Sequence, residues 1–151
     1  MKITTNDILD ALMKEPTLAY GGFHRTPAEA SNTRSDLLTH IAEVQLCYDW
    51  LQMQEIGKRI TDRSPSSYYL KHAAEFAGGQ YVSNGCLIVA CIITGVLYQR
   101  YGDDHPNAAC AVKRRRSNRL LHGAKGKQYL GYCKFKPLRV DSPPTNCTEP
   151  A

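Results

Sequence analysis

The chain has 151 residues, 42% of them hydrophobic and 22% charged, and a formal net charge of +5. This length is enough for one domain with a sizeable core and is short for two. The composition excludes a collagen, a disulfide-dense miniprotein and a wholly disordered chain. Because Asp7 and Asp10 stand among the first apolar residues, we expect no secretory signal and a cytoplasmic location.

The first expected element is a short helix over residues 6–14. Thr5 or Asn6 can cap its start, and Pro16 ends it. Its apolar side chains recur at helical spacing: Ile8, Leu9, Leu12 and Met13. Residues 15–32 mix glycine, proline and small polar residues, which predicts a loop.

A second helix is expected from residue 33 to about residue 58. Thr33, followed three residues later by Asp36, resembles a capping box, and Gly57 is a candidate end. The apolar residues that build one buried face are Leu37, Ile41, Val44, Tyr48 and Leu51.

A third helix is predicted to open at Ser64-Pro65 and to close at Gly78-Gly79. The side chains expected to face inward are Tyr69, Leu70, Ala73 and Phe76.

The fourth predicted helix covers residues 85–101, with Ser83 or Asn84 as its cap and Gly102 as its stop. No residue from Cys86 to Tyr98 is charged. This run would make ~20 Å of helix, which is short of the ~30 Å hydrocarbon core of a membrane. An apolar surface all round is typical of a central, buried helix, with a buried strand as the alternative.

The C-terminal third predicts short β structure. Residues 108–112 are consistent with a strand, residues 126–140 with a small β element, and residues 141–151 with a frayed tail. The expected fold is mainly α, a compact bundle of about four helices. We divide the chain into a helical domain (1–112), a basic segment packed on the same domain (113–140) and the tail.

Charge is distributed unevenly among these parts. Residues 1–112 hold 9 Lys and Arg against 12 Asp and Glu, whereas residues 113–140 hold 10 basic residues and no acidic one. Such a block favours a polyanion as its partner, and a solvated tail without a specific partner is the alternative. Aromatic residues between the cations can stack on unpaired bases, or can pack a β element on the helices. The residues expected to bind nucleic acid are Lys113, Arg114, Arg115, Arg116, Arg119, Lys125, Lys127, Tyr129, Tyr132, Lys134 and Lys136.

A possible phosphate site lies at the start of the fourth helix. Free backbone N–H groups at a helix N-terminus attract anions. The residues that could contribute are Lys71, His72, Ser83 and Asn84, although ordinary helix capping explains the last two equally well.

The sequence contains no recognisable catalytic motif. There is no nucleophile elbow, P-loop, dinucleotide fingerprint or C-x-x-C pair. We therefore expect no catalytic residues and no cofactor. The six cysteines are expected to be reduced, and Cys47, Cys86 and Cys91 to lie in the core. Two helical pairs, His40-x-x-Glu43 and His72-x-x-Glu75, leave a small metal-dependent enzyme as a minor alternative.

One stretch carries a resemblance. Its residues are SSYYLKHAAE at 66–75, YVSNG at 81–85, then Ile88 and Ala90. This pattern resembles a motif of small uncharacterised bacterial proteins, often of plasmid or phage origin, and covers under a third of the chain. The resemblance implies a bacterial, cytoplasmic, mobile-element protein and brings no activity with it.

These observations together predict a non-catalytic bacterial accessory protein that binds DNA or RNA through phosphate contacts of its basic segment. The principal alternative is an interaction module or inhibitor that docks an acidic protein. We expect no contact with a membrane, and the apolar fourth helix leaves a homodimer possible.

Overall fold

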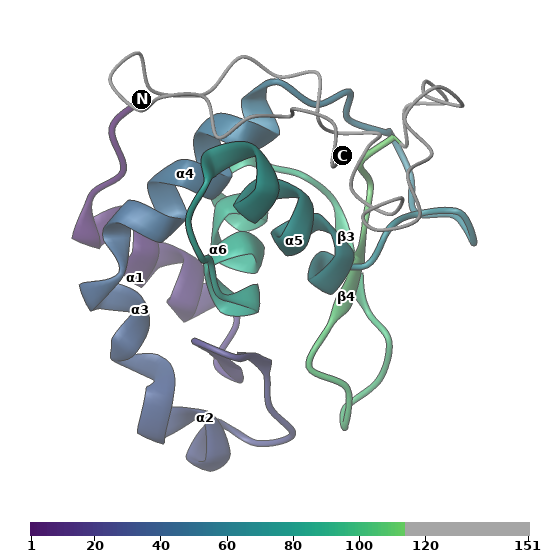
Figure 1. Ribbon diagram of the computed structural model, residues 1–151. Helices are drawn as coiled ribbons and strands as arrows, with labels where there is room; N and C mark the ends of the chain where they lie inside the picture. The colour runs from purple at the N-terminus through teal and green to yellow at the C-terminus, as the bar shows by residue number, and fades with distance from the viewer. Residues whose placement is uncertain (114–151) are drawn as a thin grey trace, which may run out of the picture.

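The computed structural model describes residues 1–113 and shows a mainly helical fold with two small antiparallel sheets (Figure 1). The helices are α1 (Thr5–Lys14), α2 (Pro27–Arg34), α3 (Asp36–Thr39), α4 (Ile41–Gln52), α5 (Ser67–Gly78) and α6 (Asn84–Thr94). The strands are β1 (Leu18–Ala19), β2 (Gly22–Phe23), β3 (Tyr98–Arg100) and β4 (Ala108–Cys110); β1 pairs with β2 and β3 with β4.

Helix α6 forms the centre of the fold, as its uncharged sequence predicts. Every residue from Asn84 to Cys91 is buried, and α1, α4 and α5 pack around the helix (Figure 1). A helix that is apolar all round can only hide its surface when other helices cover each side. The largest side chains that complete this core are Ile8, Leu18, Leu37, Trp50, Leu51 and Leu70.

The predicted end of this helix at residue 101 is wrong. Helix α6 stops at Thr94 because Gly95 takes a left-handed conformation (φ 75°), which glycine adopts without a steric penalty. The chain then continues as β3, whose backbone pairs with β4. The apolar run thus contains both a helix and the approach to a strand, and its composition does not mark the boundary. The alternative of one buried strand is also wrong.

The predicted helix over residues 33–58 is three separate pieces. Thr33 lies inside α2 and does not cap a helix. His40 has a non-helical backbone (φ −105°, ψ 39°) and separates α3 from α4, which ends at Gln52. Its ring nitrogen Nδ1 donates a hydrogen bond to the Asp36 carbonyl at 2.7 Å. The same carbonyl, of the first residue of α3, also accepts from the His40 N–H and the Thr39 hydroxyl, so three bonds meet there where the chain bends.

The predicted loop over residues 15–32 contains a hairpin and most of α2. Leu18, Ala19 and Phe23 are buried, so the hairpin of β1 and β2 belongs to the core. Thr26 caps α2, and Pro27 occupies its first turn. The guanidinium of Arg34 donates to four backbone carbonyls, those of Leu12, Glu15, Pro16 and Leu18. This single side chain therefore connects α2 to the end of α1 and to β1.

Helix starts and faces also differ in detail from the prediction. Thr4, not Thr5 or Asn6, forms a capping box with Asp7. Ser66, not Ser64, caps α5. Leu9 and Met13, which belong to the apolar set expected for the first helix, and Phe76, which is expected to face inward, are exposed. The helical spacing identifies each helix, but it does not fix where the apolar face ends.

The strand predicted over residues 108–112 is confirmed as β4, and Cys47, Cys86 and Cys91 are buried as expected. The β element predicted over residues 126–140 lies outside the described residues. Among residues 1–113, no helix has the length and apolar character needed to cross a membrane.

Candidate functional site

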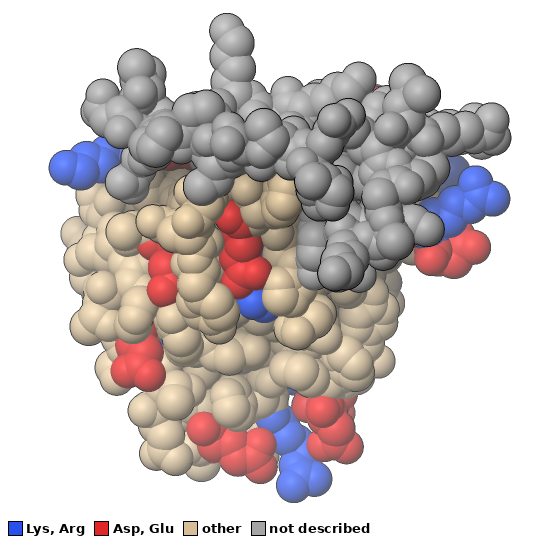
Figure 2. All heavy atoms as spheres, in the orientation of Figure 1, with Lys and Arg blue, Asp and Glu red and all other residues tan. Residues whose placement is uncertain are grey.

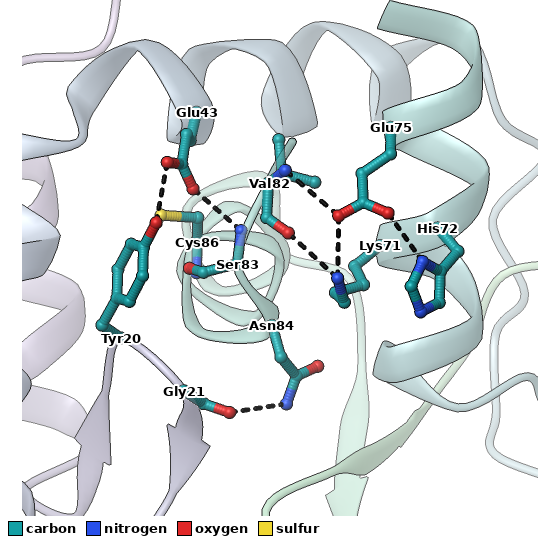
Figure 3. A network of polar contacts seen from close by, with 10 residues as sticks. All are labelled: Tyr20, Gly21, Glu43, Lys71, His72, Glu75, Val82, Ser83, Asn84 and Cys86. Atoms are coloured by element: carbon teal, nitrogen blue, oxygen red, sulfur yellow. Dashed lines mark hydrogen bonds and ion pairs between the residues drawn. The ribbon is translucent and has the colours of Figure 1, made fainter. Parts of the chain in front are cut away.

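The two His-x-x-Glu segments converge on the backbone that leads into α6 (Figure 3). Glu75, on α5, accepts a hydrogen bond from the Val82 N–H at 3.3 Å, and Glu43, on α4, accepts one from the Ser83 N–H at 2.8 Å. Two consecutive amides therefore bind two carboxylates that lie 32 positions apart in the sequence. This arrangement holds the start of the central helix between α4 and α5.

On the α5 side, Glu75 binds two basic side chains. Lys71 Nζ lies 2.7 Å from Glu75 Oε1, and His72 Nδ1 lies 2.6 Å from Glu75 Oε2. Lys71 Nζ also donates to the Val82 carbonyl at 3.3 Å. Only 5% of the Lys71 surface is exposed, so its charge depends on Glu75 for compensation.

The pKa of Glu75 reflects these bonds. Burial raises the pKa of its carboxyl, but the hydrogen bonds from Lys71, His72 and the Val82 N–H lower it more, and the net pKa lies below the ordinary value of 4.5. Because the folded-state pKa is below the unfolded-state pKa, the carboxylate stabilises the fold above about pH 4.5. This stabilisation is lost as the pH falls through the folded-state pKa.

We therefore expect the difference in unfolding free energy between the wild type and Glu75→Gln to shrink as the pH falls from about 5 to about 3. Urea denaturation followed by circular dichroism at several pH values measures it. Glu29→Gln, at an exposed carboxylate, is the control. A wild-type advantage over Glu75→Gln that stays constant down to about pH 3 would contradict this assignment of the bonds.

On the α4 side, Glu43 accepts a second hydrogen bond, from the Tyr20 hydroxyl at 2.8 Å. Burial, and then this bond to Glu43, raises the pKa of Tyr20. His40 Nε2 lies 3.9 Å from the Glu43 carboxylate, and its ring packs against Tyr20 with centroids 4.5 Å apart. Burial also raises the pKa of Cys86 nearby, which keeps its thiol protonated and unreactive.

The geometry of the two pairs does not support the metal alternative. Among residues 1–113, no three His, Cys, Asp or Glu side chains gather in a way that could hold a metal ion. Each carboxylate binds a backbone amide and its own neighbours. The two pairs therefore have a structural role, because they bind the backbone at Val82 and Ser83. The His-x-x-Glu spacing is compatible with this role as well as with a metal site.

The four residues of the predicted phosphate site have other partners in the structure. Lys71 and His72 both bind Glu75, and the Ser83 hydroxyl accepts from the Cys86 N–H at 3.0 Å as a helix cap. The Asn84 amide nitrogen donates to Pro106 O, Asn107 Oδ1 and Gly21 O at 3.0, 3.0 and 3.4 Å. With Glu43 already at the Ser83 N–H, a phosphate there would approach a carboxylate.

Of the residues expected to bind nucleic acid, only Lys113 lies within the described part. Its N–H donates to the Glu55 carbonyl at 2.8 Å, and its Nζ lies 2.5 Å from Glu55 Oε1. The others lie outside the described residues: Arg114, Arg115, Arg116, Arg119, Lys125, Lys127, Tyr129, Tyr132, Lys134 and Lys136.

The loop that precedes α5 brings further cations to the start of the basic segment. Gly57 N donates to Ala111 O at 2.6 Å, and Ile56 forms a β-bridge with Val112. The same loop carries the exposed residues Lys58, Arg59 and Arg63. They precede the basic segment by about 50 positions, so the distribution of charge along the sequence does not show that the two lie together.

Several cations of the described body bind groups of the protein itself. Arg34 binds four carbonyls, and Lys71 binds Glu75. Arg100 binds Thr17 Oγ1 and the carbonyls of His24 and Asp103, with its guanidinium over the Phe23 ring. On the face drawn in Figure 2, acidic side chains are spread over the described surface and basic ones are fewer.

Comparison of this chain with family models, with curated proteins and with solved structures gives no match.

Proposed function

We propose that this chain is a non-catalytic nucleic-acid-binding protein whose basic segment, residues 113–140, contacts phosphates. It would act as an accessory protein of the bacterial plasmid or phage type that the motif around residues 66–90 resembles. The observation that carries the proposal is the separation of charge: ten basic and no acidic residues in the segment, beside a body with more acidic than basic residues. A cationic block of this kind can contact several phosphates of a nucleic-acid backbone at once.

The contacts of the described residues support a binding surface at the basic segment and not on the rest of the body. The three cations Lys71, Arg34 and Arg100 are engaged within the body, so they are poorly placed to bind an external polyanion. By contrast, Lys58, Arg59 and Arg63 are exposed on the loop that pairs with residues 111–113. The loop also carries the exposed acids Glu55 and Asp62, so it would add a net charge of +1 to the positive surface of the basic segment.

Salt dependence tests the proposal. Each phosphate contact contributes about 0.7 to 0.9 to the slope of log affinity against log salt. We expect Arg115→Gln/Arg116→Gln to weaken binding to both single-stranded and duplex DNA and to reduce that slope by roughly 1.4 for the single strand and roughly 1.8 for the duplex. Fluorescence anisotropy with labelled oligonucleotides at low and moderate salt measures both quantities.

The matched control removes the same charge elsewhere. Lys14→Gln/Arg25→Gln alters two exposed cations of the N-terminal third. It should change affinity much less than the segment variant does. Equal losses in both variants would show that net charge alone acts, and no binding to any nucleic acid would contradict the proposal and leave an acidic protein as the partner.

A further inference from the structure

Two exposed tyrosines have their rings close to the buried Lys71 ammonium. The Lys71 Nζ atom is 4.6 Å from the centroid of the Tyr81 ring and 5.5 Å from that of Tyr68. The tyrosines are 61% and 51% exposed, whereas Lys71 is only 5% exposed. The Tyr68 ring also meets the His72 ring edge-on, with centroids 4.6 Å apart. Both tyrosines nevertheless keep more than half of their surface exposed to solvent.

The cation itself is fixed by the fold. Glu75 Oε1 and the Val82 carbonyl bind Lys71 Nζ at 2.7 and 3.3 Å, as the close view shows (Figure 3). An ammonium over the face of an aromatic ring attracts it through the ring quadrupole. Both tyrosines are thus held by an anchored group, so less side-chain freedom is lost when a ligand packs on them.

We propose that Tyr68 and Tyr81 are a stacking site for unpaired nucleobases, which makes single-stranded nucleic acid the preferred ligand of this protein. The inference rests on the proposed function, because the basic segment supplies the phosphate contacts. Base stacking on exposed aromatic rings contributes to affinity without requiring a particular sequence. In a duplex the faces of the bases are already stacked on one another, so the same rings gain little from it.

Tyr68 lies in the first turn of α5, beside the strand that leads to the basic segment. Ser66 forms a β-bridge with Ala109, and the Ser67 hydroxyl accepts from the Ala108 N–H at 3.1 Å, which places the first turn of α5 beside β4. Lys113 follows Ala109 by four residues, a reach of at most about 14 Å. A short single strand can therefore contact the rings and the cations together.

Local charge is compatible with this ligand. The ammonium of Lys71 and the carboxylate of Glu75 compensate each other, so the rings lie in a surface of low net charge. Phosphates would be attracted toward the basic segment and the exposed loop cations, while bases reach the rings. An acidic protein partner would use the cations in the same way but has no comparable need for two exposed ring faces.

The experiment compares a fluorescein-labelled oligothymidine strand with a duplex of equal length, using the full chain. We expect Tyr68→Ala/Tyr81→Ala to weaken single-strand binding by about thirtyfold or more and duplex binding by less than about twofold. Tyr68→Phe/Tyr81→Phe keeps both rings and should bind the strand like the wild type. Tyr101→Ala removes a tyrosine of matching exposure, 52%, and should have little effect.

Each other outcome overturns the inference and identifies the cause. If the Ala double variant binds the strand normally, the rings do not stack on bases and their surface is left to a protein partner. If strand and duplex binding fall equally while the melting temperature is unchanged, the rings act without distinguishing bases from backbone. If the wild type binds neither probe, the proposed function fails as well. If the melting temperature of the alanine double variant does change, a strand that contains 2-aminopurine replaces the affinity comparison. Its fluorescence reports base stacking directly, so no change on binding to the wild type would contradict the stacking site.

Discussion

Replacing Gly85 with alanine is expected to lower the free energy of unfolding by about 3 kcal/mol or more. A Cβ atom at this position would lie 2.0 Å from the Ala19 carbonyl oxygen and 2.5 Å from that of Tyr20. Both atoms belong to the backbone, and the Gly85 N–H already donates to Tyr20 O at 2.9 Å. The hairpin of β1 and β2 would therefore have to move away from the central helix. Urea denaturation of the purified variant measures the loss.

Helix propensity alone would make Gly85→Ala stabilising, because alanine is more favourable than glycine in a helix by about 1 kcal/mol. A loss in the Gly85→Ala variant must then come from the close approach of the two backbones. Gly21→Ala is the control, since a Cβ there would have no atom within 4 Å. Similar denaturation midpoints for the two variants would contradict the close packing of α6 against the hairpin.

The second large effect is expected at Glu75. The Glu75→Leu substitution should lower the free energy of unfolding by about 3 kcal/mol, because it leaves the 95%-buried Lys71 ammonium without its carboxylate. The variant also removes the acceptor of His72 Nδ1 and of the Val82 N–H. The expected cause is an uncompensated buried charge, so replacing Lys71 with an apolar residue in the same variant should recover part of the lost stability.

A double-mutant cycle tests that cause. If the charge is responsible, Lys71→Met/Glu75→Leu should be more stable than Glu75→Leu alone, since the unpaired ammonium is gone. Thermal denaturation and urea denaturation of the four proteins complete the cycle. Losses that simply add would show that Lys71 and Glu75 stabilise the fold independently of each other.

Local signals in the sequence predicted much of the helical framework. Helix α1, the helix from Ser67 to Gly78, the central position of α6 and strand β4 follow from apolar spacing, an apolar run and the stop at Gly78-Gly79, whereas the caps predicted for α1 and α5 are wrong. The two errors in helix length have one common origin. His40 breaks a helix whose apolar spacing continues through it, and Gly95 ends a helix whose apolar composition continues past it. The spacing of apolar residues indicates which side chains are buried, whereas the backbone conformation of a single residue decides where a helix ends.

The candidate site was only partly visible in the same way. The two His-x-x-Glu segments stand out at helical spacing, but the pattern alone equally suits a metal site, and only the fold shows each carboxylate on a backbone amide. The stacking site has no pattern of its own, since Tyr68, Lys71 and Tyr81 come from a helix and a connection. The exposed cations before α5 are likewise connected to the basic segment by the tertiary pairing of residues 55–57 with residues 111–113.

The sequence by itself determined the mainly helical class, the burial of α6 and the concentration of positive charge after residue 112. These properties depend on composition and on spacing within one or two helical turns, which neighbouring residues encode directly. The tertiary structure decided the meeting of Glu43 and Glu75 at Val82 and Ser83, and the contact of Gly85 with the hairpin. It also decided that the Lys71 ammonium lies close to the rings of two tyrosines. Each of these depends on segments distant in the chain, whose contact is selected by the packing of the whole core.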